Sequence, residues 1–168
     1  LDELRHPLSS TFSQLHMRTN IDLNCNRHLK IFNEENIIPS FCFGCFKVQV
    51  NTKSLVNLLR VTIIFYRLES EENLIKKCMV ETRPNVTGFF KGFIYCRSIE
   101  QATRVKKVID LELEAKTDKT ITSLIKRGCT EFGIEYPEYS KILNNGRAPM
   151  LYPNEWNINN AVSYTHLT

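Results

Sequence analysis

The chain has 168 residues, of which 42% are hydrophobic and 24% are charged, and 22 Lys and Arg against 18 Asp and Glu give a formal net charge of +4. This ordinary globular composition excludes a fully disordered chain, a collagen-like repeat and a strongly acidic tail. The mild positive charge permits a polyanionic partner without requiring one. The six cysteines are too few for a secreted disulfide scaffold, yet they are enough to need a role.

The two ends of the chain lead to three expectations. No secretory signal pattern opens the sequence, and the longest strongly apolar run, 61–66, is far too short to span a membrane. We therefore expect a cytoplasmic protein with no membrane contact, whose cysteines are thiols or metal ligands. Residues 162–168 resemble translated sequencing-adapter DNA, so we expect a foreign tail and a natural chain that continues beyond both ends.

The amino-acid composition of the first half of the chain changes near residue 41. Residues 1–40 are polar and rich in asparagine, and they predict only a short helix over 27–36 that Pro39 ends. Alternating apolar and polar residues then predict a strand over 46–50. The helix predicted over 55–64 is so apolar that we expect it to be buried on more than one side.

The second half of the predicted fold contains three strands and one helix. We predict a strand over 75–83, a strand over 89–96, a helix over 98–115 and a strand over 121–127. Pro84 and Asn85 separate the first two of these strands, which predicts a hairpin. Ser98 and Gln101 form a capping box, which marks the start of the helix.

The order strand, helix, strand, strand, helix, strand over 41–128 is typical of the α+β, ferredoxin-like βαββαβ fold. We expect an antiparallel sheet in the order 4-1-3-2, with both helices on one face and the other face open to solvent or a partner. The remaining segments are predicted as a polar, partly helical N-terminal segment (1–40), a loop-rich extension (129–161) and the foreign tail (162–168).

Strand alternation sorts the residues of the predicted sheet onto its two faces. On the third strand the smaller and more apolar set faces the helices, so the other set faces outward. Glu81 also lies on the open face and is expected to take part in cross-strand ion pairing rather than substrate binding. Arg127 replaces Lys126 on this face if the last strand shifts by one residue. The residues predicted to bind a ligand there are Lys47, Arg83, Lys91, Phe93, Tyr95 and Lys126.

The segment 91–96 (KGFIYC) resembles the RNP1 segment of RNA-recognition motifs, which lies on the third strand of this fold. The resemblance implies that Phe93 and Tyr95 stack on bases and that Lys91 contacts phosphate. The chain departs from the family at Ile94, where a small residue is usual. The alternative is that the two aromatic side chains are covered by one of the terminal segments.

Three cysteines are expected to meet at one edge of the sheet. Cys42 and Cys45 form a C-x-x-C motif at the start of the first strand, and Cys129 follows the last strand. Those strands are antiparallel neighbours in the predicted fold, and Cys25 or His28 is placed to add a fourth ligand. Four such ligands suit zinc, and four thiolates also suit an iron–sulfur cluster. The alternative is that these cysteines are small buried hydrophobic residues.

The sequence contains no P-loop, no nucleophile elbow and no zinc-protease motif, which argues against a common enzyme class. We therefore predict a non-catalytic binding module, with RNA or another phosphate-bearing ligand on the open sheet face as the leading partner. One alternative is a unit built around cysteine-bound zinc or an iron–sulfur cluster. Another is a structural or regulatory domain that works with the other domains of a longer, truncated enzyme.

Overall fold

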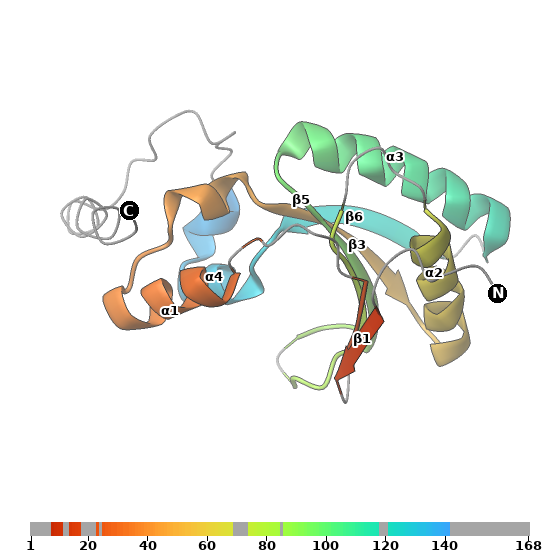
Figure 1. Cartoon of the computed structure of the whole chain (residues 1–168), viewed down its shortest axis with the longest axis horizontal. Helices are drawn as coiled ribbons and strands as arrows, with labels where there is room; N and C mark the ends of the chain where they lie inside the picture. The colour runs from red at the N-terminus through yellow and green to blue at the C-terminus, as the bar shows by residue number, and fades with distance from the viewer. Residues whose placement is uncertain are drawn as a thin grey trace. The chain divides into compact units, whose positions relative to one another are not determined.

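The computed structural model describes residues 8–11, 14–17, 23, 25–68, 74–84, 86–117 and 121–141 (Figure 1). In chain order its elements are β1 (Leu8–Thr11), β2 (Gln14–Met17), α1 (Cys25–Glu35), η1 (Ser40–Gly44), β3 (Phe46–Thr52), α2 (Leu55–Arg67), β4 (Lys76–Val80), β5 (Phe90–Cys96), α3 (Ile99–Lys116), β6 (Thr122–Arg127), α4 (Thr130–Glu135) and η2 (Pro137–Lys141), where η denotes a 3-10 turn.

The described residues divide into two compact units. The sheet unit contains β1, β2 and the chain from Phe46 to Lys126. The cysteine unit contains α1, η1 and the described chain from 127 to 141, so it is built from the segments on either side of the long central stretch. The predicted foreign tail, 162–168, lies outside the described residues.

The sheet unit holds one six-stranded sheet in the order β1-β2-β4-β5-β3-β6. The predicted four-stranded ferredoxin-like sheet of order 4-1-3-2 with two helices is therefore wrong. Two strands from the polar N-terminal segment extend the sheet, and the described chain contains four α-helices. The physical reason is edge pairing: β2 runs antiparallel to β4 from Gln14↔Met79 to Met17↔Lys76 and satisfies backbone groups that the predicted sheet left open.

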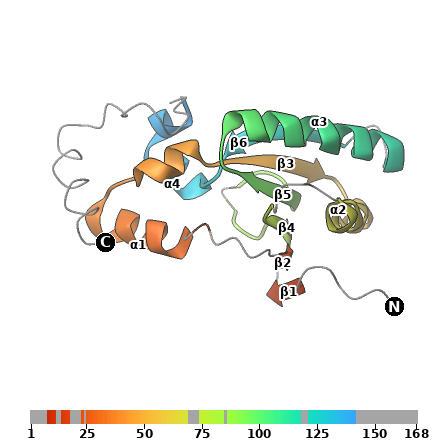
Figure 2. The ribbon, with the colours of Figure 1, turned by 45° about the horizontal axis from the view of Figure 1, so that its top comes forward.

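The antiparallel register of β3 with β5 determines which residues lie on each face of the sheet. Val48, Val50 and Ile94 are fully buried in one core with Val61 of α2 and Ile109 of α3. Both helices therefore cover the same face, and α3 runs along the sheet in Figure 2. Because side chains alternate along a strand, the intervening residues of β3 and β5 lie on the opposite face.

Helix α2 begins at Ser54, whose hydroxyl oxygen accepts a hydrogen bond of 3.2 Å from the backbone N–H of Asn57. The helix is buried on one side only, which corrects the expectation of burial on more than one side. Its buried residues are Leu58, Val61, Ile64 and Phe65, and its exposed apolar residues are Leu55, Val56, Leu59 and Ile63.

Helix α3 begins at the predicted cap. The hydroxyl of Ser98 accepts a 3.1 Å hydrogen bond from the backbone N–H of Gln101. The side-chain oxygen of Gln101 accepts a 2.6 Å bond from the backbone N–H of Arg97, one residue before the cap. These bonds satisfy backbone donors that have no partner within the helix.

The segment predicted as a loop-rich extension contains regular structure in its described part. Residues 130–135 form α4 and residues 137–141 form η2. In the part of the chain that the structure describes, no helix combines the length and apolar character needed to cross a bilayer.

Gly92 provides the first testable prediction. A Cβ atom at this position would lie 2.8 Å from Cε2 of Phe65 and 3.0 Å from Cγ1 of Val61, so α2 packs directly against the backbone of β5. We expect Gly92→Ala to lower the free energy of unfolding by about 1–3 kcal/mol through overpacking. Denaturant unfolding followed by circular dichroism measures this change.

Gly133→Ala is the matched control. A Cβ at Gly133 meets only Cδ1 of Tyr139, at an ordinary 4.0 Å, and the residue lies within α4. This substitution is expected to be neutral or slightly stabilising, because alanine is the better helix former. Equal stability of the two variants would contradict the close packing at Gly92.

Candidate functional site

The polar face is the face of the sheet opposite α2 and α3, and it is defined by strand alternation and by the register of the pairs. Its position follows from Val48, Ile94 and Cys78, which lie in the core on the helical side. The described residues of the polar face include Gln14 and His16 of β2, Lys77, Met79 and the adjacent Glu81 of β4, Lys91, Phe93 and Tyr95 of β5, Lys47, Gln49 and Asn51 of β3, and Lys126 of β6.

Phe93 occupies the middle of the polar face. The ammonium nitrogen of Lys47 lies 5.0 Å from the centroid of its ring, and that of Lys77 lies 5.6 Å away. Both distances are typical of cation–π interactions. The ring of Tyr95 lies 6.4 Å from that of Phe93. Phe93 is only 6% exposed, so it presents little ring surface for the base stacking that the sequence predicts, whereas Tyr95 is half-buried.

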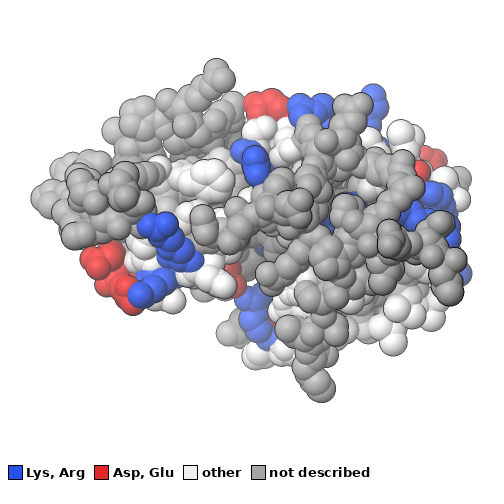
Figure 3. Space-filling model, in the orientation of Figure 1, with Lys and Arg blue, Asp and Glu red and all other residues white. Residues whose placement is uncertain are grey.

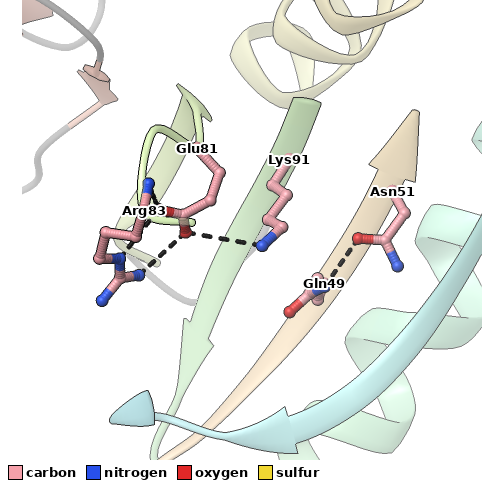
Figure 4. A network of polar contacts seen from close by, with 5 residues as sticks. All are labelled: Gln49, Asn51, Glu81, Arg83 and Lys91. Carbon is pink, nitrogen blue, oxygen red and sulfur yellow. Dashed lines mark hydrogen bonds and ion pairs between the residues drawn. The ribbon is translucent and has the colours of Figure 1, made fainter. Parts of the chain in front are cut away.

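Glu81 is the centre of a polar network on this face (Figure 4). Its carboxylate accepts hydrogen bonds from Nε of Arg83 at 2.8 Å, from the terminal nitrogen of Arg83 at 2.9 Å and from the Arg83 backbone N–H at 3.1 Å. The ammonium of Lys91 lies 3.5 Å from Oε2 of Glu81, the oxygen that also accepts from the terminal nitrogen of Arg83. Beside this network, Nε2 of Gln49 donates a 2.7 Å bond to Oδ1 of Asn51.

The network shifts two pKa values. The hydrogen bonds from Arg83 lower the pKa of Glu81 to about 2, against the opposing effect of burial, and the charge of Lys91 contributes in the same direction. Burial lowers the pKa of Lys91, and the negative charge of Glu81 offsets part of that shift. Glu81 is 3% and Lys91 2% exposed, so the pair is a buried ion pair whose two charges depend on each other.

The structure brings most of the predicted ligand residues together and adds two. The polar face contains Lys47, Lys91, Phe93 and Tyr95. Arg83 forms an ion pair with Glu81. Lys126 is exposed, and its charge contributes to lowering the pKa of Lys91. Ile125 packs on the helical core, which fixes the register of β6 in favour of Lys126. The residues absent from the predicted site are Lys77 and Glu81, although alternation along the strand places both on this face.

The predicted metal ligands all fall in the cysteine unit. Cys42 lies in η1, Cys45 ends that turn, Cys129 directly precedes α4 and Cys25 is the first residue of α1. All of them are thiols rather than disulfides. Among the described residues, no three His, Cys, Asp or Glu side chains converge as a ready-made metal site. His28 instead packs against Phe41, with ring centroids 5.6 Å apart.

Two residues beside these thiols were not predicted as part of a site. The hydroxyl of Tyr139 donates a 2.8 Å hydrogen bond to the backbone oxygen of Cys42, and burial raises the Tyr139 pKa. The guanidinium of Arg127 lies 5.3 Å from the Tyr139 ring and donates to the backbone oxygen of Phe43. Sequence offers little signal for the two hydrogen bonds, because they join residues 97 and 84 positions apart.

A scan against protein-family models, a search of curated proteins and a search of solved structures each found no significant match to this chain. The resemblance of 91–96 to the RNP1 segment therefore stays a prediction.

The buried ion pair predicts how stability depends on pH. The folded pKa of Glu81, about 2, lies below the ordinary value of 4.5. The stabilisation is therefore complete above about pH 5 and is lost as the pH falls toward 2. Glu81→Gln removes the countercharge of buried Lys91, and we expect it to lower the unfolding free energy at pH 7 by about 3 kcal/mol and to flatten the dependence on pH between 5 and 2.5.

The control for this prediction is Glu34→Gln. Glu34 pairs with Lys30 at 3.8 Å on the exposed surface of α1, where an ion pair contributes little. Chemical unfolding across the pH range measures all three proteins. If Glu81→Gln retained the full acid-induced loss of stability of the unmodified chain, the assignment of that loss to Glu81 would be wrong.

Proposed function

We propose that this chain is a non-catalytic binding module whose polar face takes single-stranded RNA or another phosphate-bearing ligand. The observation that carries the proposal is the charge balance around the two rings of the face. Among its described residues and the adjoining loop, Glu81 is the only carboxylate, against five cations: Lys47, Lys77, Arg83, Lys91 and Lys126. Cations beside aromatic rings are the usual elements of a single-strand interface.

The exposed residues decide where a ligand makes first contact. Arg83 and Lys126 are exposed, and Lys77 and Tyr95 are half-buried, whereas Lys47, Lys91 and Phe93 are buried. The proposal therefore gives phosphate contact to the cations that reach solvent, Arg83, Lys126 and Lys77, and base stacking to Tyr95. Phe93 holds the ammonium groups of two lysines in place beside that ring.

The attraction depends on individual cations rather than on one broad positive field. In the view of Figure 3 the described Lys and Arg side chains lie in separate patches, with acidic side chains between some of them. The net charge of the chain is only +4. Binding should therefore involve few phosphates and show a modest dependence on salt. The proposal includes a cytoplasmic location, where thiols stay reduced.

The test uses a fluorescently labelled oligouridylate and measures its anisotropy over a range of salt concentrations. Tyr95→Ala is expected to weaken binding roughly tenfold or more, because it removes the accessible stacking surface. Lys77→Gln is expected to weaken binding and to reduce the slope of log affinity against log salt by about 0.7, the value of one phosphate contact on a single strand.

Lys107→Gln is the matched control, since Lys107 is exposed on α3, away from the polar face. It removes the same charge and should change neither the affinity nor the salt slope appreciably. Competition with inorganic phosphate separates recognition of phosphate alone from recognition of a strand. Equal effects of Lys77→Gln and Lys107→Gln, together with unchanged binding by Tyr95→Ala, would refute the proposed interface.

A further inference from the structure

The cysteine unit gathers four thiols from three separate parts of the chain. Cys25 opens α1, Cys42 and Cys45 belong to the turn before β3, and Cys129 lies between β6 and α4. Cys42 and Cys129 pack in the same apolar cluster, which also contains Ile38, Phe43, Phe132 and Tyr139. Apolar packing alone does not require sulfur at four positions that are so far apart in sequence.

Backbone hydrogen bonds set the spacing of three of these thiols. The N–H of Cys45 donates a 3.2 Å bond to the carbonyl oxygen of Cys42, which turns the C-x-x-C segment back on itself. The N–H of Gly128 donates a 2.9 Å bond to the carbonyl oxygen of Cys45. The residue before Cys129 is thereby fixed against the end of the C-x-x-C turn.

Gly128 allows an unusually close approach to sulfur. A Cβ atom at this position would lie 2.3 Å from Sγ of Cys45, a separation that no side chain could tolerate. The thiol of Cys45 therefore lies directly against the backbone that leads into Cys129. Burial raises the pKa of Cys42, and Cys129, Cys45 and Cys25 contribute in the same direction, so these three thiols lie within electrostatic range of Cys42.

We propose that Cys25, Cys42, Cys45 and Cys129 bind one zinc ion as a structural site of the cysteine unit. Four thiolates at about 2.3 Å around a single ion form the tetrahedral arrangement typical of such sites. The described side chains do not converge as a ready-made site, so the proposal requires the cysteine side chains to reorient when the ion binds. Each thiol loses its proton on binding, and the divalent cation offsets the negative charge of the thiolates.

Two features favour a single zinc ion over an iron–sulfur cluster. The contact between Cys45 and Gly128 leaves little space between the C-x-x-C turn and Cys129, and one ion needs less room than a cluster. Arg127 is buried and donates a hydrogen bond to the backbone oxygen of Phe43 in the C-x-x-C turn, so it places a positive charge beside that turn. This cation partly offsets the two negative charges that four thiolates leave on a bound zinc ion.

The test titrates the reduced, metal-free full chain with Co²⁺, which replaces zinc and reports its ligands by absorbance. We expect saturation at one Co²⁺ per chain, a thiolate-to-cobalt charge-transfer band, visible bands typical of tetrahedral coordination, and displacement by Zn²⁺. The unmodified chain alone can overturn the proposal, since absence of the charge-transfer band at equimolar Co²⁺ would exclude a tetrathiolate site.

Variants then identify the ligands. Cys42→Ser and Cys129→Ser are each expected to lose about a quarter of the charge-transfer intensity or to stop binding, whereas Cys129→His retains one ion through nitrogen with altered visible bands. Cys78→Ser is the matched control, because Cys78 is a buried thiol of β4 in the sheet unit. An equal loss in Cys78→Ser would contradict the assignment. If elemental analysis of the purified chain found iron and sulfide instead of zinc, the zinc assignment would be wrong and an iron–sulfur cluster would take its place.

Discussion

The antiparallel register of β3 and β5 is the constraint on which the sheet unit depends. It sets Val48 opposite Ile94 and Val50 opposite Gly92 on the helical side. The same register sets Lys47 opposite Tyr95, Gln49 opposite Phe93 and Asn51 opposite Lys91 on the other side. A shift of one residue would exchange the two sets and bury the charges under the helices, so the pairing fixes the core and the polar face together.

The polar face keeps its charges through local compensation. Lys91 remains buried because Glu81 lies beside it, and Glu81 is in turn held by Arg83. The ammonium groups of Lys47 and Lys77 lie over the ring of Phe93. Among the described residues of the face and the adjoining loop, five cations stand against one carboxylate, and this excess of cations is the physical basis for proposing an anionic ligand.

Much of the central structure could be predicted from sequence because its patterns are local. Alternation in β3 and β5, the cap at Ser98 and the apolar residues of α2 all act over a few positions. Strands β1 and β2 could not be predicted, because each has only four residues and shows no clear apolar alternation. β2 pairs with the distant β4, and β1 pairs with β2 at the edge of the sheet. Helix α4 is likewise short and lies in a segment rich in glycine and proline.

The candidate sites likewise have features that local sequence patterns predict and features that depend on long-range contacts. Alternation places Lys47, Lys91, Phe93 and Tyr95 on one face, but it says nothing about how deeply each is buried, because burial depends on the whole fold. The ion pair of Lys91 with Glu81 and the contacts of Tyr139 with the cysteine turn join separate strands or segments. The placement of Cys129 beside the C-x-x-C turn could be predicted from the strands that these cysteines flank, but the hydrogen bond from Gly128 to Cys45 that joins the two segments has no local sequence pattern.

The discontinuous cysteine unit also sets an order of folding. Its hydrogen bonds from Arg127 to Phe43, from Tyr139 to Cys42 and from Tyr136 to Asn36 join residues 84, 97 and 100 positions apart. Contacts of such long range are slow to form when the intervening chain is unfolded, because closing the loop costs entropy. β3 and β6 are neighbours in the sheet, and Cys45 and Gly128 flank them in the chain. Formation of the sheet therefore brings Cys45 close to Gly128 and lowers the entropy cost of the remaining contacts. The cysteine unit is thus expected to assemble last, after the ribosome has released nearly the whole described chain.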